Sequence, residues 1–378
     1  MSHPPFLPLL RPEIDEQTIR GVADVLRSGW IAAGPVAEAF EAALSQFLRG
    51  RTVRVFNSGA AALEVALRMI GVDEGHEVII PPIAWAATGN AVLTVGARPV
   101  FVDVDPVRRT LDPAQIEAAI TPRTRAIVPV HLGGQPCDID GLYAVAHQHG
   151  LRVIEDAAQA LGATWRGRPV GSFGDFAAFS FHASHTVTSV EGGCLVLPPD
   201  TDAGFAERWR VQGISRSGVD GMDVDVVGGS TSHLTDVAAR VGLGQLQRLA
   251  EFTARRRALA HRYFEAFDAI GAAARGIALP PRELDNANWL LFQIALPPQV
   301  QRPVFMQVLH ERGIGTGVHY PAMHLFTLYR RLGWKGGDFP HAERIGRSIV
   351  SLPLFSSMEE ADVDRVVVET DRALRGIA

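Results

Sequence analysis

Short apolar segments alternate with helical segments between residues 50 and 200, and this alternation limits the possible folds of the chain. The apolar segments are rich in Val and Ile, as strands are. In order, they read VRVFNS, EVIIP, RPVFVDVD, RAIVPVHL, LRVIEDAA, DFAAFSF and CLVLP. Strands separated by helices predict a mostly parallel sheet with helices on both faces. Right-handed crossovers bring the carboxyl ends of such strands to one edge, where ligands are expected.

The pattern changes after about residue 245, which indicates a second unit with mixed elements. The elements expected there are a long helix over 243–267, a strand over 289–297, a helix over 302–313, a short strand over 314–320 and a helix over 358–376. A chain of 378 residues is long enough for two domains. We therefore expect an N-terminal arm (1–12), a large α/β domain (13–245) and a smaller C-terminal α+β domain (246–378).

Composition and charge exclude several classes of protein. The net charge is −5 and no basic block occurs, which argues against a nucleic-acid partner. No apolar run approaches the ~20 residues of a membrane span, and the N-terminus lacks the pattern of a signal peptide. The two cysteines, Cys137 and Cys194, suit a reducing cytoplasm and are too few for an iron–sulfur cluster held by this chain alone.

Lysine usage restricts the chemistry, because the chain contains one lysine, Lys335, in the segment GWKGGDF. Replacement of lysine by arginine in a GC-rich genome is a sufficient explanation. Whatever its cause, any reaction that needs a lysine amine must use Lys335.

Two segments at the ends of expected strands have the features of ligand sites. Asn57 and Gly59 flank the start of a helix, whose free N–H groups and positive dipole end can bind phosphate. The alternative is an ordinary capped helix. Asp156 ends the strand LRVIED and could pair with a protonated ring nitrogen, or could cap the next turn. Trp85 could lie on an aromatic cofactor or belong to the core.

The segment SFHASHTVTSVEGG contains His182 and His185, three residues apart. Such a pair could provide half of a zinc site, but no third ligand lies nearby in the sequence, so we expect no metal. Two ordinary polar histidines are the alternative.

Taken together and in this order, the segments resemble the DegT/DnrJ/StrS family of sugar aminotransferases, which have fold type I and depend on pyridoxal phosphate (PLP). The resemblance covers nearly the whole chain. It rests on SGWIAAGP, NSGAAAL, GHEVIIPPIAWAAT, ARPVFVDVDP, VIEDAAQALGA, GSFGDFAAFSFHAS, EGG and GIGTGVHYPAMH, among others. The resemblance implies a homodimer with its active site at the subunit interface.

The resemblance assigns one group of residues to the cofactor phosphate. Gly59 and Ala60 match the phosphate-binding turn, although Ala60 is often threonine in the family. Ser180 matches a serine that binds the phosphate. His233, in STSHLTD, is the nearest match to a residue that the neighbouring chain supplies, but the usual Asn-Tyr-Arg pattern is absent.

A second group matches positions around the cofactor ring and the substrate. Trp85 corresponds to the aromatic residue that stacks on the ring, and Asp156 to the carboxylate that keeps the ring nitrogen protonated. Gln159 corresponds to the residue beside the 3-hydroxyl group of the cofactor. His319 and His324 match positions on the substrate side.

His185 departs from the aminotransferase pattern, because it stands where these enzymes have the lysine that binds PLP covalently. Imidazole forms no stable Schiff base, so no covalent lysine aldimine is expected. An unperturbed imidazole titrates near pH ~6.5 and can act as an acid or a base. One branch of the family, the nucleotide-4-keto-6-deoxysugar 3-dehydratases, has histidine here and uses pyridoxamine phosphate (PMP). In that branch the histidine moves a proton at the 4′ carbon of the cofactor, and the 3-hydroxyl group leaves.

Three functions therefore remain open. The first is PMP-dependent 3-dehydration of a nucleotide-linked 4-keto-6-deoxysugar, with His185 as acid and base and glutamate regenerating PMP. The second is a sugar aminotransferase whose lysine has been replaced by His185, naturally or by engineering; the contexts EDAAQALGATWRGRPVG and SFHAS favour it. The third is a non-catalytic homologue, against which the retention of Asp156, Trp85 and Ser180 argues.

Overall fold

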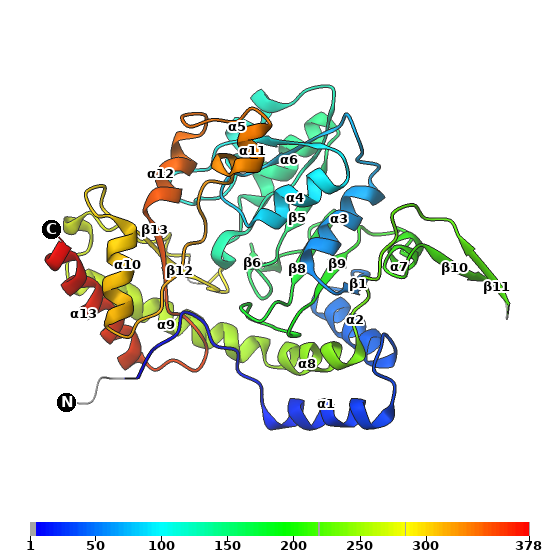
Figure 1. Ribbon diagram of the computed structural model, residues 1–378, viewed down its shortest axis with the longest axis horizontal. Coiled ribbons are helices and arrows are strands. Elements are labelled where there is room, and N and C mark those ends of the chain that lie inside the picture. Colours follow the sequence, from blue (N-terminus) through cyan, green and yellow to red (C-terminus); the bar gives the residue numbers. More distant parts are fainter. Residues whose placement is uncertain (1–4, 218–219, 284, 378) are drawn as a thin grey trace.

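The computed structural model describes residues 5–217, 220–283 and 285–377. Its main feature is a seven-stranded sheet in the order β1-β9-β8-β5-β4-β2-β3 (Figure 1). The strands are β1 (Val53–Phe56), β2 (Glu77–Ile80), β3 (Arg98–Phe101), β4 (Thr124–Ile127), β5 (Arg152–Asp156), β8 (Phe176–Ser180) and β9 (Gly193–Val196). Neighbouring strands run parallel from β8 to β3, whereas β9 runs antiparallel to both of its neighbours, β1 and β8. The prediction of a mostly parallel sheet is confirmed.

Helices cover both faces of this sheet because successive side chains of a strand point to opposite sides. Phe56 of β1 enters the core under α3 (Gly59–Met69) and α4 (Ala86–Thr94). Its neighbour Val55 enters the core under α2 (Pro35–Phe47) and α8 (Asp236–Gln247). A further core lies between β4 and α6 (Ile139–His149).

The C-terminal part has its own core around a two-stranded antiparallel sheet. In this sheet β12 (Phe292–Ala295) pairs with β13 (Ile349–Leu352). The helices α9 (Leu249–Ala269), α10 (Arg302–Glu311) and α13 (Glu360–Ile377) pack on it. Leu7 of the N-terminal segment joins the same core.

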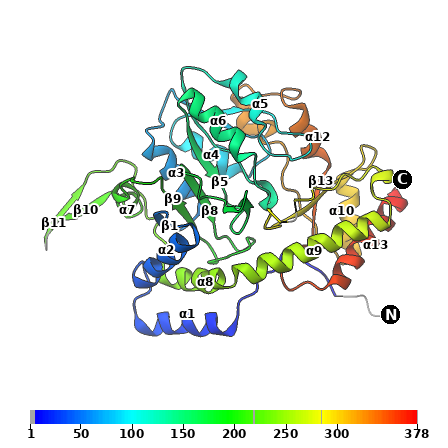
Figure 2. The same cartoon turned by 180° about the vertical axis from the view of Figure 1, so that it is seen from behind.

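The remaining elements are shorter or lie at the periphery. They are α1 (Glu16–Ser28), α5 (Pro113–Ile116), α7 (Gly204–Trp209), α11 (Thr327–Arg331), α12 (Pro340–Ser348), β6 (Thr164–Trp165), β7 (Arg168–Pro169), β10 (Ile214–Ser217) and β11 (Gly221–Val224). The β10–β11 pair projects from the body of the molecule (Figures 1 and 2).

Two expected elements differ from the structure. The helix predicted over 243–267 is interrupted at Arg248, whose ψ of 3° is not helical, so α8 and α9 follow one another along one edge (Figure 2). The segment 314–320 forms no strand ladder, because Ile314 pairs with Leu7 whereas Gly317 pairs with Ser351.

The segment after residue 320 returns to the large sheet. Met323, Tyr329 and Ile345 belong to the core that also contains β2 and β3 residues. The predicted boundary at 245/246 falls inside α8, and the division into domains stays a prediction. No helix in the described ranges combines the length and apolar character needed to cross a membrane.

Candidate functional site

A cavity of about 390 Å³ lies at the carboxyl ends of the parallel strands. Strand β5 ends at Asp156 and β8 ends at Ser180, so both side chains reach this edge. The predicted site residues that line the cavity are Gly59, Ala60, Trp85, Asp156, Gln159, Ser180, His185 and His319. Residues more than 250 positions apart in the sequence are therefore brought together.

The start of α3 contributes Ser58, Gly59 and Ala60 to the lining of the cavity. Ser58 caps this helix, and its hydroxyl oxygen accepts a hydrogen bond from the N–H of Ala61 at 3.2 Å. A Cβ atom on Gly59 would lie 2.9 Å from Cβ of Ser180, so only glycine lets the helix approach β8 this closely. The first N–H groups of the helix and the hydroxyl group of Ser180 together suit a phosphate.

Asp156 supplies a buried carboxylate to the same cavity. Its Oδ2 accepts a hydrogen bond from the Thr88 hydroxyl at 2.6 Å, and its Oδ1 accepts one from the N–H of Ala158 at 3.2 Å. Burial raises the pKa of Asp156, and these two hydrogen bonds partly oppose the shift. A buried carboxylate that makes no ion pair within the described chain favours a cationic ligand, such as a protonated ring nitrogen.

Trp85 is 64% exposed, which rules out the alternative that it is a core residue. Its ring centroid lies 5.7 Å from that of Tyr320, and both side chains line the cavity. The exposed indole therefore offers an aromatic face to a ligand.

Gln159 is held by hydrogen bonds at both ends of its amide. Its Oε1 accepts from the N–H of Gly133 at 2.6 Å, and its Nε2 donates to the Tyr320 hydroxyl at 2.6 Å. The Tyr320 hydroxyl hydrogen then remains available to the cavity.

His185 is half-buried, and its Nδ1 lies 3.0 Å from the carbonyl oxygen of Ser180. A carbonyl only accepts, so Nδ1 carries the hydrogen and Nε2 has a lone pair. Burial lowers the pKa of His185 to about 4. The imidazole is therefore neutral at physiological pH, with Nε2 as the nitrogen that can accept a proton.

The rim of the cavity is polar. His182 and Glu191 are exposed, line the cavity and approach each other to 3.6 Å. The His182 and His185 rings meet edge to face with centroids 6.0 Å apart. No group of three or more side chains suited to a metal ion occurs in the described part of the chain.

Two predicted residues do not line the cavity in this structure. His324 is buried against Phe339, with its Nε2 3.3 Å from Glu343, because the chain after residue 320 folds back into the large core. His233 is predicted for the site of a neighbouring chain, so its place outside this cavity leaves that prediction untested; it pairs with Phe56 through the backbone, and its Nδ1 is buried without a partner in the described residues. Lys335 is exposed in the turn before α12 and is not a lining residue.

Three neighbours of the cavity were missed in the sequence. Thr88 lies one helical turn after Trp85, a spacing that could have revealed it. Tyr320 adjoins His319 in the chain. Ser351 contacts His319 from 32 positions away and has no local signal.

An open cavity of about 600 Å³ adjoins the first one and shares Ser58, Ala60 and Trp85 with it. Asn57, Asn90 and other polar residues line it. This space can hold the part of a ligand that extends beyond the first cavity.

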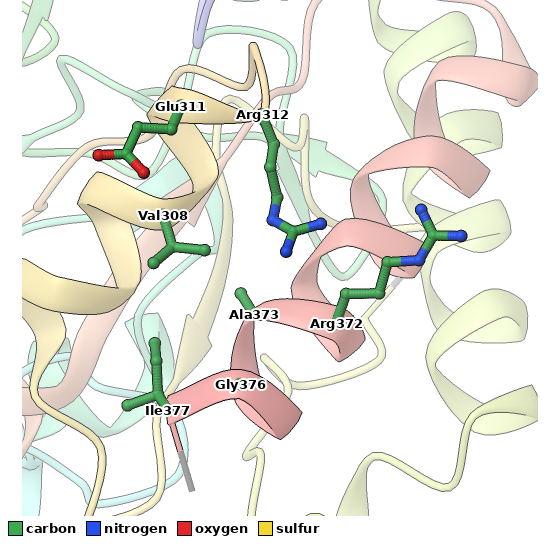
Figure 3. A pocket seen from close by; sticks show the side chains of 7 residues that line it. All are labelled: Val308, Glu311, Arg312, Arg372, Ala373, Gly376 and Ile377. Atoms are coloured by element: carbon green, nitrogen blue, oxygen red, sulfur yellow. The ribbon is translucent and has the colours of Figure 1, made fainter.

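A separate cavity of about 410 Å³ lies between α10 and α13 (Figure 3). Arg312 and Arg372 line it, but both guanidinium groups pair with Glu369 at 2.6 Å. None of the predicted site residues lies there, so the strand-edge cavity is the better candidate.

Known proteins resemble this chain over its whole length. SpsC, a spore coat polysaccharide biosynthesis protein of Bacillus subtilis (strain 168), is 36% identical over 385 residues, with 98% of each chain covered. The PMP form of Spr1654 from Streptococcus pneumoniae has a TM-score of 0.92 at 30% identity and covers 99% of this chain and 100% of that one. DesI, solved with its TDP-sugar product, has a TM-score of 0.86 at 33% identity, covering 100% and 95%.

A sequence profile of the DegT/DnrJ/EryC1/StrS aminotransferase family matches residues 12–370, nearly the whole chain. The large, mostly parallel sheet agrees with the fold of these relatives. The chain therefore belongs to the DegT/DnrJ/EryC1/StrS aminotransferase family.

Proposed function

We propose that this protein binds PLP or PMP without a covalent link and acts on a nucleotide-linked keto-sugar. The preferred reaction is PMP-dependent 3-dehydration of a 4-keto-6-deoxysugar. The observation that supports this proposal is that the His185 imidazole lines the same cavity as Asp156. The resemblance to the family implies that His185 stands where the aminotransferases have a lysine.

The lining residues fit this cofactor. Asp156 is a buried carboxylate for the ring nitrogen, Trp85 an aromatic face, and the start of α3 with Ser180 a phosphate cradle. Spr1654 has been solved in PLP and PMP forms, which supports the assignment. When bound, PMP supplies an amine that reacts with ketones and a ring that accepts electrons.

The residues of the chain position these groups and move protons. Asp156 would hold the ring nitrogen in its protonated form, and Thr88 and the N–H of Ala158 orient its carboxylate. His185 accepts and returns a proton at Nε2, because its Nδ1 is committed to the Ser180 carbonyl. Trp85 and Tyr320 line the cavity with aromatic surface.

The second candidate is transamination of a keto-sugar, with His185 in place of the usual lysine and glutamate as amino donor. It is supported by the aminotransferase family to which the chain belongs. A non-catalytic homologue is the third candidate, and the retained Asp156, Trp85 and Ser180 argue against it.

The assembly and its location follow the family pattern in this proposal. The family resemblance implies a homodimer with its active site at the subunit interface, and this assembly is part of the proposal. The absence of a spanning helix in the described ranges is compatible with a cytoplasmic enzyme. DesI has been solved with a TDP-sugar, which supports a nucleotide-linked substrate.

The test is incubation of the purified protein with PMP, glutamate and a nucleotide-4-keto-6-deoxyhexose, followed by mass spectrometry of the sugar. Loss of the 3-hydroxyl group supports dehydration. Gain of an amino group on the sugar supports transamination instead. Ligand binding without turnover supports the non-catalytic reading, and failure to bind either cofactor form overturns the proposal.

A further inference from the structure

The segment that carries His319 is fixed on the small antiparallel sheet by a pair of residues that face each other across strands β12 and β13. Gln293 and Ser351 are cross-strand partners. The backbone of Ser351 exchanges two hydrogen bonds with Gly317, at 3.1 and 2.8 Å. The amide Nε2 of Gln293 donates to the carbonyl oxygen of His319. Together these contacts define how the His319 ring enters the cavity.

The Ser351 hydroxyl group determines which nitrogen of His319 carries the hydrogen. Ser351 is completely buried, and its Oγ lies 2.8 Å from Nδ1 of His319. No other acceptor for this hydroxyl occurs in the described residues, and a buried hydroxyl hydrogen without an acceptor is costly. The hydroxyl therefore donates to Nδ1, which leaves the hydrogen of the neutral ring on Nε2.

His185 is in the opposite state, because its Nδ1 donates to the carbonyl oxygen of Ser180. Both histidines line the same cavity. In each ring Nδ1 is hydrogen-bonded to a serine, Ser180 for His185 and Ser351 for His319, so Nε2 is the nitrogen left for a ligand. Burial lowers the pKa of each ring to about 4, so both are neutral at physiological pH. The two rings consequently differ in hydrogen-bonding character although they have the same charge.

We propose that the cavity presents a matched donor and acceptor to one ligand: Nε2–H of His319 donates to a ligand oxygen, and Nε2 of His185 accepts a proton. Ser351 is the positioning residue that makes His319 a donor. The complementary ligand carries a ketone or hydroxyl oxygen and binds next to the cofactor, at which His185 moves a proton in the proposed reaction. This ligand assignment rests on the keto-sugar function proposed above, whereas the tautomer assignment does not.

The tautomers can be measured without substrate or turnover. In 15N-histidine-labelled protein, long-range 1H–15N correlation spectra distinguish a ring protonated at Nδ1 from one protonated at Nε2. The signals are assigned by comparison with His185→Gln and His319→Gln proteins. We expect hydrogen on Nδ1 of His185 and on Nε2 of His319. The same tautomer for both rings would overturn the proposal, even if the enzyme were active.

The role of Ser351 is tested with Ser351→Ala and a matched control, Ser348→Ala, which removes a hydroxyl that bonds to Arg344 at the end of α12. In Ser351→Ala the Nε2–H form of His319 should lose its dominance, while Ser348→Ala should leave the spectrum unchanged. An unaltered His319 signal in a folded Ser351→Ala protein refutes the positioning role. Should Ser351→Ala not fold, Ser351→Cys replaces the hydroxyl by a weaker donor and gives the same comparison.

Kinetics then test the ligand assignment. Glutamine can place an amide N–H near the position of Nε2, whereas asparagine places it near Nδ1. His319→Gln should therefore keep at least tenfold more kcat than His319→Asn, with similar KM values, because the contact strengthens in the transition state. Equal loss in both variants, with normal tautomers in the parent protein, refutes the donor role while leaving the proposed reaction intact. Absence of turnover in the parent protein refutes the proposed function and, with it, the ligand assignment.

Discussion

Replacement of Asp156 by asparagine tests two effects of its buried charge, one on cofactor affinity and one on the stability of the cofactor-free protein. The carboxylate is 6% exposed and is held by Thr88 and by the N–H of Ala158. Asparagine keeps the size and one acceptor oxygen but removes the charge. We therefore expect the variant to bind PMP more weakly and, without PMP, to be at least as stable as the parent protein.

The loss of affinity follows from the ion pair that Asp156 would form with the cofactor ring. Removing one partner of a buried pair costs about 3–5 kcal/mol. This cost corresponds to a rise in Kd of about 100-fold to 4,000-fold. At a PMP concentration of 100 times the parent Kd, the parent gains about 2.7 kcal/mol of stability, and the variant should gain less than half of that.

The effect on the cofactor-free protein has the opposite sign. Burial raises the folded-state pKa of Asp156 above its unfolded value of ~3.9. The contribution of this group to the free energy of unfolding is therefore fully present below pH ~3.9, where the carboxyl group is protonated, and is lost as pH rises through the raised pKa. Asp156→Asn removes that loss, so its cofactor-free stability should depend less on pH above pH ~4.

The assay is thermal unfolding with and without PMP, combined with a fluorescence titration of PMP. Asp24→Asn is the control, since Asp24 forms an exposed pair with Arg27. A Kd for PMP within threefold of the parent value would refute the reasoning about Asp156. A variant that is less stable than the parent without PMP at pH 7 would refute the claim that the unpaired carboxylate destabilises the fold.

Three further predictions concern the same cavity. Borohydride treatment of the PLP-loaded protein should leave no covalent adduct, whereas the same treatment of His185→Lys should give an adduct at residue 185. Mass spectrometry checks both results. An adduct on Lys335 in active protein would contradict the proposal. Because burial lowers the pKa of His185 to about 4, kcat/KM should be flat between pH ~6 and 8 and fall only as pH approaches ~4. A decline of kcat/KM centred near pH ~6.5 would instead show an unperturbed imidazole. Gly59→Ala places a Cβ 2.9 Å from Ser180, so it should cost about 1–3 kcal/mol of stability and weaken PMP binding. Gly376→Ala is the control, because its added atom meets open space. An unchanged Tm for Gly59→Ala would contradict the close approach of α3 to β8.

The parts of the site that sequence patterns predicted lie next to the strands of the large sheet. Asp156 ends its strand and Gly59 follows β1, so the rule that ligands bind at carboxyl ends places both at one edge, whereas Ser180, at the end of β8, was assigned by the family resemblance. Helix and strand periodicity is local, which explains why these elements agree with the structure.

The residues that could not be predicted depend on how distant segments meet. His319 and His324 look equivalent in GVHYPAMH, but the chain turns between them, so one lines the cavity and the other packs on Phe339. Ser351 reaches His319 because β12 and β13 pair, and that pairing has no counterpart in local sequence patterns. The interruption at Arg248 likewise falls within a continuous helical pattern.

The return of the chain after residue 320 to the large core affects how ligands enter and leave. Met323 and Tyr329 are fully buried beneath the large sheet, although they are joined to the segment held by β12 and β13. A motion that pulled the segment after residue 320 away from the large core would have to expose these side chains to water, at a cost of roughly 1.5–3 kcal/mol for each large apolar group. Exchange of cofactor and product should therefore proceed past the polar rim at His182 and Glu191, while the segment after residue 320 stays packed on the large core.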